Sequence, residues 1–479
     1  MADQRKNSPG TKFSRRLFAE AGLGGLAALL RAHNVGAATL PGQAHGFTSV
    51  ADNPAPSTQS PDLHATLMTI DVTDFGATGN AVTDDAPAIN AAIRAVRERH
   101  RTIGPFDLGC RIVFPTGVYA VESSIDLTNL QRINTVIDGG GAAILGRCAG
   151  KPVIDGLGTR WLTVRDLNII GDSTSVPDIG IQIGLLTRRV VADDHRFENV
   201  KVVGHFQRAC FYNRAAETSG FDHLMLWNYH PDSYCLVQDG VNHFGVTSQF
   251  AMSDIATDTG LSFNENEFIN CDFRHAAGGT AVWLGDTARH AFIRCYAATG
   301  RGPAFIIYCG SNSHITLDID CHCETFGLRD VFLIAGRPGP ARLRGFSYRD
   351  HVCYAENSVF RCQPDITHVE MENARLDIPL FNKEDCKVFD QPEKWTVTGS
   401  FYSSERNHLG SNTAFEGLIM IGTSSTFSGT LGGALPVLSP DFVPAPGELR
   451  RGSLALDAAT NKLLVWSGSR WTDALGGPR

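Results

Sequence analysis

Residues 196–202 read RFENVKV, and the same pattern returns as GFDHLML at residues 220–226, as EFINCDF at residues 267–273 and as AFIRCYA at residues 291–297. Aligning the four segments produces one aromatic column, at steps of 24, 47 and 24 residues: Phe197, Phe221, Phe268 and Phe292. The longer step is either two coils of a repeat or one coil plus a loop. Each segment alternates apolar with polar residues and is followed by a second short strand. The pattern predicts a repeat fold built from short β-strands.

The length of the repeat separates three repeat architectures. A parallel β-helix stacks short strands so that an apolar inner ladder is buried. Leucine-rich repeats have a similar length but require a Leu-x-x-Leu-x-Leu pattern, which this sequence lacks. Propeller blades need about 40 residues or more. The expected fold class is therefore all-β, a right-handed parallel β-helix (solenoid).

A helix is expected ahead of the repeat. Residues 70–79 (IDVTDFGATG) read as a strand that ends in a glycine turn. Asp84 and Asp85 then precede Ala86 and Pro87, which predicts a helix start, because Asp is a favoured cap and Pro fits the first turn. These two aspartates are therefore expected to be cap and turn residues rather than catalysts. The apolar stripe of the helix follows at helical spacing: Ala88, Ile89, Ala92, Ile93 and Val96.

The motifs in this region carry a family resemblance. FGATG at residues 75–79, TDDAPAI at 83–89 and VFPTGVY at 113–119 together resemble the N-terminal cap and first coil of the pectate-lyase-like superfamily (rhamnogalacturonase/epimerase-like pectate lyase domain). The resemblance covers residues 69–122. It implies a right-handed parallel β-helix with an N-terminal capping helix and an enzyme that cleaves polysaccharide, although phage tailspikes share the architecture. Trimers are common among such relatives, which leaves a homotrimer open.

Substrate identity does not follow from the resemblance. Polygalacturonases carry a Gly-His-Gly motif, whereas Gly204 and His205 are followed here by Phe206. The Arg-x-Pro-x-x-Arg pattern of extracellular pectate lyases is approached only between Arg337 and Arg342, with the proline misplaced.

The N-terminus resembles a bacterial twin-arginine export signal. Arg15 and Arg16 precede a short apolar stretch at residues 21–30, and small residues follow at 35–38. We therefore expect a periplasmic or secreted protein. No other stretch approaches the roughly 18 apolar residues of a membrane span, so no membrane anchor is expected.

Composition shifts and turn signals predict five parts: the signal at residues 1–38, a linker at 39–68, the β-helix at 69–430, a second linker at 431–448, and a small hairpin-like β module at 449–479.

The net charge bears on the expected binding partners, and the positions of the cysteines bear on whether disulfides form. The net charge of −8 makes nucleic acid an unexpected partner, because phosphate binding needs a basic face. It leaves an acidic polysaccharide open, since a basic groove can be local. The twelve cysteines lie within apolar runs, so we expect buried free thiols rather than disulfides.

Candidate site residues come from the outward positions of the strands. Period-2 alternation divides each strand into an inner and an outer set, and adjacent coils lie ~4.8 Å apart. Polar outer residues of neighbouring coils should therefore form one patch of the size of a sugar. The candidate catalytic residues are Asp272, Arg294, Tyr296, Asp318, Asp320 and His322. The candidate substrate-binding residues are Lys201, Trp227, Arg274 and Glu324.

These residue types allow several reactions. A β-eliminating lyase needs a base such as Arg294, Tyr296 or His322, and a cation or Ca²⁺ to neutralise the uronate carboxylate. Hydrolysis needs paired carboxyls, which Asp272 with Asp318 or Asp320 would supply. No cofactor is otherwise indicated, and a Ca²⁺ requirement stays open. We expect a lyase acting on an acidic polysaccharide, with a glycoside hydrolase, a sugar epimerase or a non-catalytic glycan-binding spike as alternatives.

Overall fold

The computed structural model describes sixteen stretches of the chain: residues 68–103, 109–128, 130, 133–185, 192–239, 264–285, 289–309, 316–326, 330–355, 357–383, 386–403, 414–421, 437–438, 454–457, 462–466 and 470–473. The predicted export signal, nearly all of the first linker and most of the second linker lie outside the described residues.

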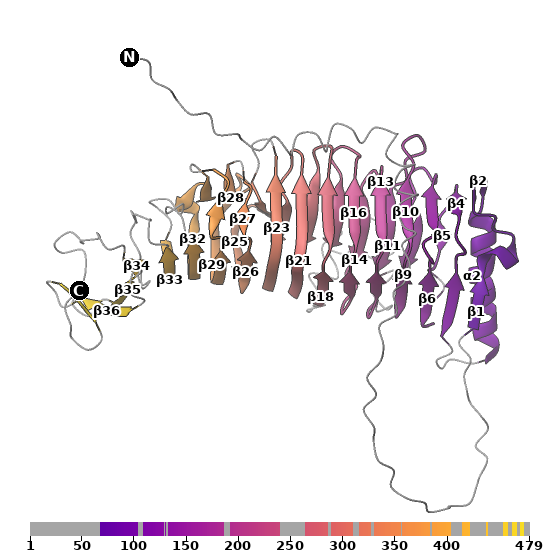
Figure 1. The fold of residues 1–479 in the computed structure, drawn as a ribbon, viewed down its shortest axis with the longest axis horizontal. Coiled ribbons are helices and arrows are strands. Elements are labelled where there is room, and N and C mark those ends of the chain that lie inside the picture. The colour runs from indigo at the N-terminus through magenta and orange to yellow at the C-terminus, as the bar shows by residue number, and fades with distance from the viewer. Residues whose placement is uncertain are drawn as a thin grey trace, which may run out of the picture. The chain divides into compact units, whose positions relative to one another are not determined.

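Two long parallel sheets form the body of the protein, as predicted for a β-solenoid (Figure 1). The 21-stranded sheet contains β1 (Met68–Asp71), β2 (Asn80–Asp84), β3 (Cys110–Val113), β4 (Val118–Val121), β6 (Thr135–Asp138), β7 (Ala143–Gly146), β9 (Leu162–Arg165), β10 (Asn168–Gly171), β12 (Arg196–Glu198), β13 (Lys201–Gly204), β15 (Gly220–Asp222), β16 (Met225–Asn228), β18 (Asn264–Ile269), β19 (Asp272–His275), β21 (Arg289–Thr299), β23 (Thr316–Thr325), β25 (Gly339–Arg344), β26 (Phe346–Arg349), β29 (Ile366–Asp377), β32 (Trp395–Ser403) and β33 (Ala414–Ile421). The 10-stranded sheet contains β5 (Ile125–Asp126), β8 (Ile154–Leu157), β11 (Ile179–Gly184), β14 (Ala209–Arg214), β17 (Tyr234–Asp239), β20 (Thr280–Gly285), β22 (Phe305–Cys309), β24 (Phe332–Gly336), β28 (Ser358–Cys362) and β31 (Lys387–Phe389).

The aromatic column predicted from the repeat is the register of the larger sheet. Phe197 pairs with Phe221, Phe221 with Phe268, and Phe268 with Phe292. Because β15 pairs directly with β18, the 47-residue step is one coil with an insertion rather than two coils. The insertion falls between β17 and β18, and its residues 240–263 lie outside the described residues.

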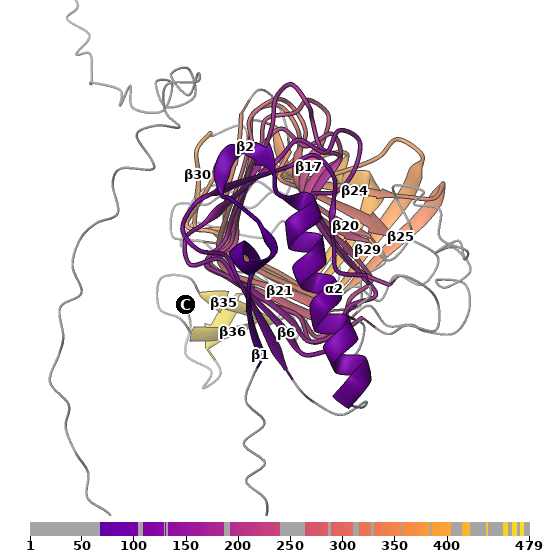
Figure 2. The same ribbon diagram turned by 90° about the vertical axis from the view of Figure 1, so that its right-hand side faces the viewer.

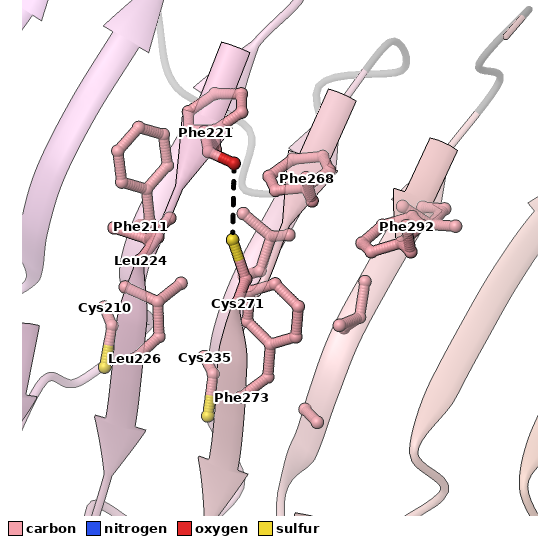
Figure 3. Close-up of a cluster of buried hydrophobic side chains, with 14 of the residues drawn as sticks. Cys210, Phe211, Phe221, Leu224, Leu226, Cys235, Phe268, Cys271, Phe273 and Phe292 are labelled. Carbon is pink, nitrogen blue, oxygen red and sulfur yellow. Dashed lines mark hydrogen bonds between the residues drawn. The ribbon is translucent and has the colours of Figure 1, made fainter. Parts of the chain in front are cut away.

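The core runs along the inside of the solenoid as stacked side chains (Figure 3). Ring centroids are 4.4 Å apart between Phe221 and Phe268 and 4.7 Å apart between Phe268 and Phe292, with nearly parallel planes. Phe211, from the smaller sheet, meets Phe221 edge-on. Identical side chains in register on neighbouring strands stack at the strand spacing, so the four phenylalanines form one continuous stack, which ends at Val164 on one side and Ile319 on the other.

All twelve cysteines are free and buried, which confirms the prediction made from their apolar surroundings. Cys271 and Cys295 lie on the inner side of neighbouring strands, and Cys295 pairs in register with Cys321. Their sulfur atoms contact backbone carbonyls, such as that of Phe221 at 3.5 Å from the Cys271 sulfur. They therefore act as small apolar core residues.

The N-terminal region contains the expected helix but a shorter strand than predicted. Strand β1 ends at Asp71, and residues Val72–Phe75 form a 3-10 turn, η1, because the Asp71 carboxylate accepts hydrogen bonds from Thr73. Helix α2 spans Ala86–Ile103, and Figure 2 shows it in front of the first strands. The predicted stripe residues Ile89, Ala92, Ile93 and Val96 are buried, and Ala88 is partly buried against the same core.

Asp84 and Asp85 have the structural roles expected of them. Asp84 accepts from the backbone N–H of Ala86 at 3.1 Å, at the helix start. Asp85 is buried and accepts from the backbone N–H groups of Thr78 and Gly79, which ties the preceding glycine turn to the helix.

Smaller elements follow the main sheets. Strands β27 (Val352–Cys353) and β30 (Leu380–Phe381) pair with each other, and η2 (Pro392–Lys394) precedes β32. Near the C-terminus, β35 (Leu454–Asp457) and β36 (Lys462–Trp466) pair antiparallel, consistent with the predicted hairpin-like module. Its sheet also includes β37 (Trp471–Asp473) and β34 (Val437–Leu438), a strand within the predicted second linker. No described helix is long and apolar enough to cross a membrane.

Candidate functional site

Register places six of the ten predicted site residues on one outer patch of the larger sheet. Along the first row, Met225 pairs with Asp272, Asp272 with Tyr296, and Tyr296 with His322. A second row lies two residues further along the same strands. There Trp227 pairs with Arg274, and Ala298 lies between Arg274 and Glu324. We call the six outward residues the site cluster: Trp227, Asp272, Arg274, Tyr296, His322 and Glu324.

Arg274 is the central cation of the site cluster. Its guanidinium carbon lies 4.7 Å from the ring centroids of both Trp227 and Tyr296. Its edge donates two hydrogen bonds to Asp272, from Nε at 2.8 Å and from Nη2 at 2.7 Å. Two aromatic faces and one bidentate carboxylate therefore hold the guanidinium in a single orientation. The side chain keeps 35% of its surface exposed, so a substrate can still reach it.

A chain of hydrogen bonds starts at Tyr296. The Tyr296 hydroxyl donates to Glu324 Oε2 at 2.7 Å. The other oxygen of Glu324 accepts from His322 Nε2 at 3.2 Å, and His322 Nδ1 lies 2.9 Å from Asp350 Oδ1. With a carboxylate at each ring nitrogen, the imidazole is best matched as a cation that donates at both positions.

The pKa values of the site cluster follow from these contacts. Hydrogen bonds to Asp350 and Glu324 raise the pKa of His322 to about 10. The hydrogen bond from His322 lowers the pKa of Glu324, although burial opposes this effect. Burial and the neighbouring Glu324 raise the pKa of Tyr296. At neutral pH the cluster therefore presents a neutral phenol, an ionised Glu324 and a cationic imidazole.

Two residues of this neighbourhood were missed in the sequence. Asp350 follows strand β26, and its side chain has no exposed surface. Tyr354 is 38% exposed, bridges to Glu324 through the backbone, and meets the His322 ring edge-on at 5.6 Å. The signal for Asp350 is its position two residues after the buried Tyr348, where the inner column calls for an apolar side chain.

Four predicted residues do not join the hydrogen-bonded network. Asp318 and Asp320 are on β23 as expected, but they pair with Ala291 and Ile293, in the part of the strand that precedes the site cluster. Lys201 is in the first row but is separated from Asp272 by Met225. Within the described part of the chain, no hydrogen bond or ion pair links any of these three to the cluster.

A kink in the backbone places Arg294 outside the patch. It has φ of +53° and forms a one-residue bulge in β21: Ile293 pairs with Asp320 and Cys295 with Cys321, which leaves Arg294 without a partner on β23. Asp166, Asn199, His223 and Asn270 have the same left-handed conformation in the preceding coils, with φ between 51° and 56°. Arg294 therefore lies at the corner of the solenoid, and its side chain is exposed.

Metal binding is not indicated by the arrangement of these groups. Within the described ranges, no group of three or more His, Cys, Asp or Glu side chains is arranged to hold a metal ion. Asp272 is bonded to Arg274, and both oxygens of Glu324 are in hydrogen bonds.

Several solved structures are similar to this chain at low sequence identity. The ORF18 protein of Geobacillus virus E2 has 14% identity and a TM-score of 0.44, with 86% of each chain covered. The A-module of mannuronan C-5 epimerase AlgE6 from Azotobacter vinelandii has 16% identity and a TM-score of 0.43, over 76% of this chain and 98% of that one. The catalytic unit of a GH87 alpha-1,3-glucanase from Streptomyces thermodiastaticus has 12% identity and a TM-score of 0.42, over 76% and 68%. These similarities add nothing about the reaction.

Comparison with curated proteins produced no significant match. Residues 69–204 match the family model described as "Rhamnogalacturonase A/epimerase, pectate lyase-like". The match starts at β1 and ends with β13, so it covers the capping helix and the first coils, up to the strand that carries Lys201. The matched family is the group that the cap and first-coil motifs of this chain resemble.

Proposed function

We propose that this protein is a carbohydrate-active enzyme that cleaves an acidic, uronate-containing polysaccharide by β-elimination. The coarser part, a carbohydrate-active β-helix enzyme, is supported by the family match of residues 69–204. The finer part rests on one observation: the Tyr296 hydroxyl is held at 2.7 Å on Glu324, while the guanidinium of Arg274 lies over the Tyr296 ring, 4.7 Å from its centroid. A proton-transfer group next to a fixed cation is what β-elimination from a uronate requires.

The proposed reaction uses the Tyr296–Glu324 hydrogen bond twice. The Tyr296 oxygen takes the proton from C5 of the uronate while its own proton passes to Glu324. The electron pair of the C5–H bond becomes the C4–C5 double bond, and the C4–O bond breaks with its pair on the leaving oxygen. That oxygen takes a proton from Tyr296, which recovers one from Glu324, so the enzyme returns to its starting state.

Arg274 provides the electrostatic stabilisation in this proposal. Removing the C5 proton places charge on the uronate carboxyl group, and a fixed cation lowers the cost of that charge. The guanidinium is oriented before substrate arrives, because it packs against the rings of Trp227 and Tyr296 and Asp272 holds its edge.

Hydrolysis is less well supported by the same groups. It needs one protonated carboxyl as acid and a second carboxylate as base or nucleophile. In the site cluster, His322 lowers the pKa of Glu324, and Asp272 is in a bidentate ion pair with Arg274. Glu324 is therefore ionised before the reaction begins, whereas hydrolysis requires a carboxyl that is protonated from the start, and Asp272 is occupied by Arg274.

Incubation with a panel of acidic polysaccharides tests the proposal, with Ca²⁺ in one series and a chelator in a second. New ultraviolet absorbance from unsaturated uronate ends is expected. New reducing ends without that absorbance would support a glycoside hydrolase, and inverted uronate residues in an intact chain would support an epimerase. Binding with no chemical change would support a glycan-binding or tailspike-like role. Each of these three outcomes contradicts the lyase proposal.

We also propose export of the protein to the periplasm or beyond the cell, on the basis of the paired arginines and the apolar stretch that follows them. A fusion of residues 1–38 to a folded fluorescent reporter tests this directly. Export is expected for this fusion and loss of export for a fusion in which Arg15 and Arg16 are both replaced by Lys. Reporter that stays in the cytoplasm in both cases would contradict the proposal.

A further inference from the structure

A buried carboxylate lies behind the site cluster and is not used in the proposed reaction. The side chain of Asp350 is fully buried, while His322, which it contacts, is 35% exposed. Its Oδ2 accepts hydrogen bonds from the Tyr348 hydroxyl at 2.9 Å and from the Cys323 backbone N–H at 3.0 Å. Its Oδ1 meets His322 Nδ1 at 2.9 Å and the Val352 backbone N–H at 3.3 Å. Four donors therefore fix one buried carboxylate in place.

The burial of the Asp350 carboxylate must be offset by favourable contacts. Burying a charge costs free energy unless the charge is paired and hydrogen-bonded, and three neutral donors satisfy only part of that need. The remaining contact, His322, is the one group within hydrogen-bonding distance in the described part of the chain that can carry a compensating positive charge. The burial of Asp350 and the charge of His322 are thus linked.

Four groups face the His322 ring from the elements around it. Asp350 lies at Nδ1 and Glu324 lies at Nε2. The Tyr296 ring is 5.7 Å away on one side, and the Tyr354 ring is 5.6 Å away and edge-on. Among these groups only Asp350 and Glu324 are carboxylates, and only Asp350 is fully buried. The imidazole therefore receives its orientation from the buried side and presents its other nitrogen to the site.

We propose that Asp350 is a positioning residue: it holds the His322 ring in one orientation and as a cation, and so keeps Glu324 ionised and in place for its hydrogen bond with Tyr296. This inference rests on the proposed function for its catalytic meaning. Its physical content, the control of the charge of His322 by Asp350, is independent of the reaction. Asp350 does not contact the exposed side of the cluster, so it is not a catalytic residue.

The charge of His322 can be measured without any substrate. Selective isotope labelling of the histidines, with His322→Gln to assign the resonance, follows the titration of this ring by NMR. In the wild-type protein the ring is expected to stay protonated well above neutral pH, in line with a pKa of about 10. In Asp350→Asn the midpoint is expected to fall by about 1 unit or more, because one of two carboxylates at the ring is removed.

Asp330 provides a matched control. It is a buried carboxylate of the same solenoid that accepts from Ser358 at 2.6 Å and from Asn357 at 3.0 Å. Asp330→Asn therefore carries the same change in a similar setting and should leave the His322 midpoint unchanged. An equal midpoint in wild type and Asp350→Asn overturns the proposal. Should Asp350→Asn fail to fold, the wild-type titration decides by itself, since a midpoint near 6.5 is incompatible with the proposal.

Kinetic measurements test separately whether Asp350 contributes to catalysis. Once a cleaved polysaccharide is known, Asp350→Asn is expected to lower kcat by about 10- to 100-fold with little change in KM, as for other buried partners of site residues. The high-pH limb of its activity profile should move to lower pH, which a merely structural loss would not produce. An unchanged profile overturns the positioning role. If no polysaccharide is cleaved, the proposed function fails while the NMR measurement still decides the role of Asp350.

Discussion

The Tyr296 hydroxyl donates a 2.7 Å hydrogen bond to Glu324, a residue 28 positions later that lies on the neighbouring strand of the larger sheet. The two residues come from successive coils, β21 and β23, and belong to the two different outward rows of the patch. The bond joins a phenol to a carboxylate that His322 keeps ionised. It is the feature on which the proposed proton transfer depends.

Removal of the Tyr296 hydroxyl should abolish most activity. In Tyr296→Phe the ring remains against Arg274, but the proton-transfer atom is lost, so kcat is expected to fall by about 100- to 10,000-fold. Steady-state rates of unsaturated-end formation measure this. Tyr402→Phe, a change at a 39% exposed tyrosine on β32, is the control and should retain full activity. Comparable rates in Tyr296→Phe and wild type would exclude Tyr296 as the proton-transfer group.

Replacement of Arg274 should separate the effect of its positive charge from the effect of its planar guanidinium group. Arg274→Lys keeps a positive charge but loses the planar contact with Trp227 and Tyr296 and the bidentate bond to Asp272. A contact of this kind is worth about 0.5–2 kcal/mol, so KM is expected to rise by about 2- to 30-fold. Arg274→Ala should lose kcat as well. Arg344→Lys, at a cation paired with Glu372 on a later strand, is the matched control and should leave both constants unchanged.

Stability should fall as the pH rises above neutral. The pKa of His322 is raised from 6.5 to about 10, chiefly by Asp350, so the folded state binds this proton more tightly than the unfolded state. Its contribution is fully present below about pH 6.5 and is lost as the pH rises through about 10. The excess in Tm of wild type over His322→Gln should therefore shrink across this window. A constant difference would contradict the prediction, and His368→Gln, outside the site cluster, is the control.

The thiols should be inert in the folded protein. All twelve are buried, and burial raises the pKa of Cys110 and of Cys148 to about 11, which suppresses the reactive thiolate. A chromogenic disulfide reagent should react slowly with the native protein and with all twelve thiols after denaturation. Fast reaction in the native state, or fewer than twelve thiols after denaturation without reductant, would show that the thiols are accessible or cross-linked.

The aromatic stack should dominate local stability. Phe268 is fully buried between Phe221 and Phe292, so Phe268→Ala removes contacts on both sides and leaves a cavity. The free energy of unfolding is expected to drop by about 3–5 kcal/mol in urea titrations. Leu380→Ala, at a side chain that is 42% exposed, should change it by less than about 0.5 kcal/mol. Similar losses for the two variants would argue against the stack as a stabilising core.

The solenoid could be predicted from the sequence because its information is local and repeated. One side-chain column per coil, with polar and apolar residues in alternation, is sufficient to assign the inner and outer faces of a strand such as β23, where every second residue is buried. The boundary of the first strand was wrong, because the side chain of Asp71 competes with the sheet for the backbone of Thr73. The 47-residue step did not distinguish two coils from one coil with an inserted loop, because both add the same number of residues between Phe221 and Phe268.

Individual site residues were harder to predict, because alternation does not report where a strand bends. Arg294 has the polar character and parity of an outward residue, yet its left-handed backbone places it at a corner. Asp318 and Asp320 continue the alternation of His322 and Glu324 but lie before that corner, beside Ala291 and Ile293. The inner position of Asp350 follows from its spacing to Tyr348, but its contact with His322 is visible only in the structure.

The sequence alone determined the architecture, the inward or outward direction of most strand residues and the free state of the cysteines. Periodic burial is a property of each strand, and it repeats in every coil. Tertiary structure decided which outward residues meet. That choice depends on the register between coils, on the bulge at Arg294 and on hydrogen bonds between residues about 28 positions apart. Contacts between coils join Arg274, Tyr296, Glu324 and His322 into one site, since side chains on neighbouring strands stand only ~4.8 Å apart.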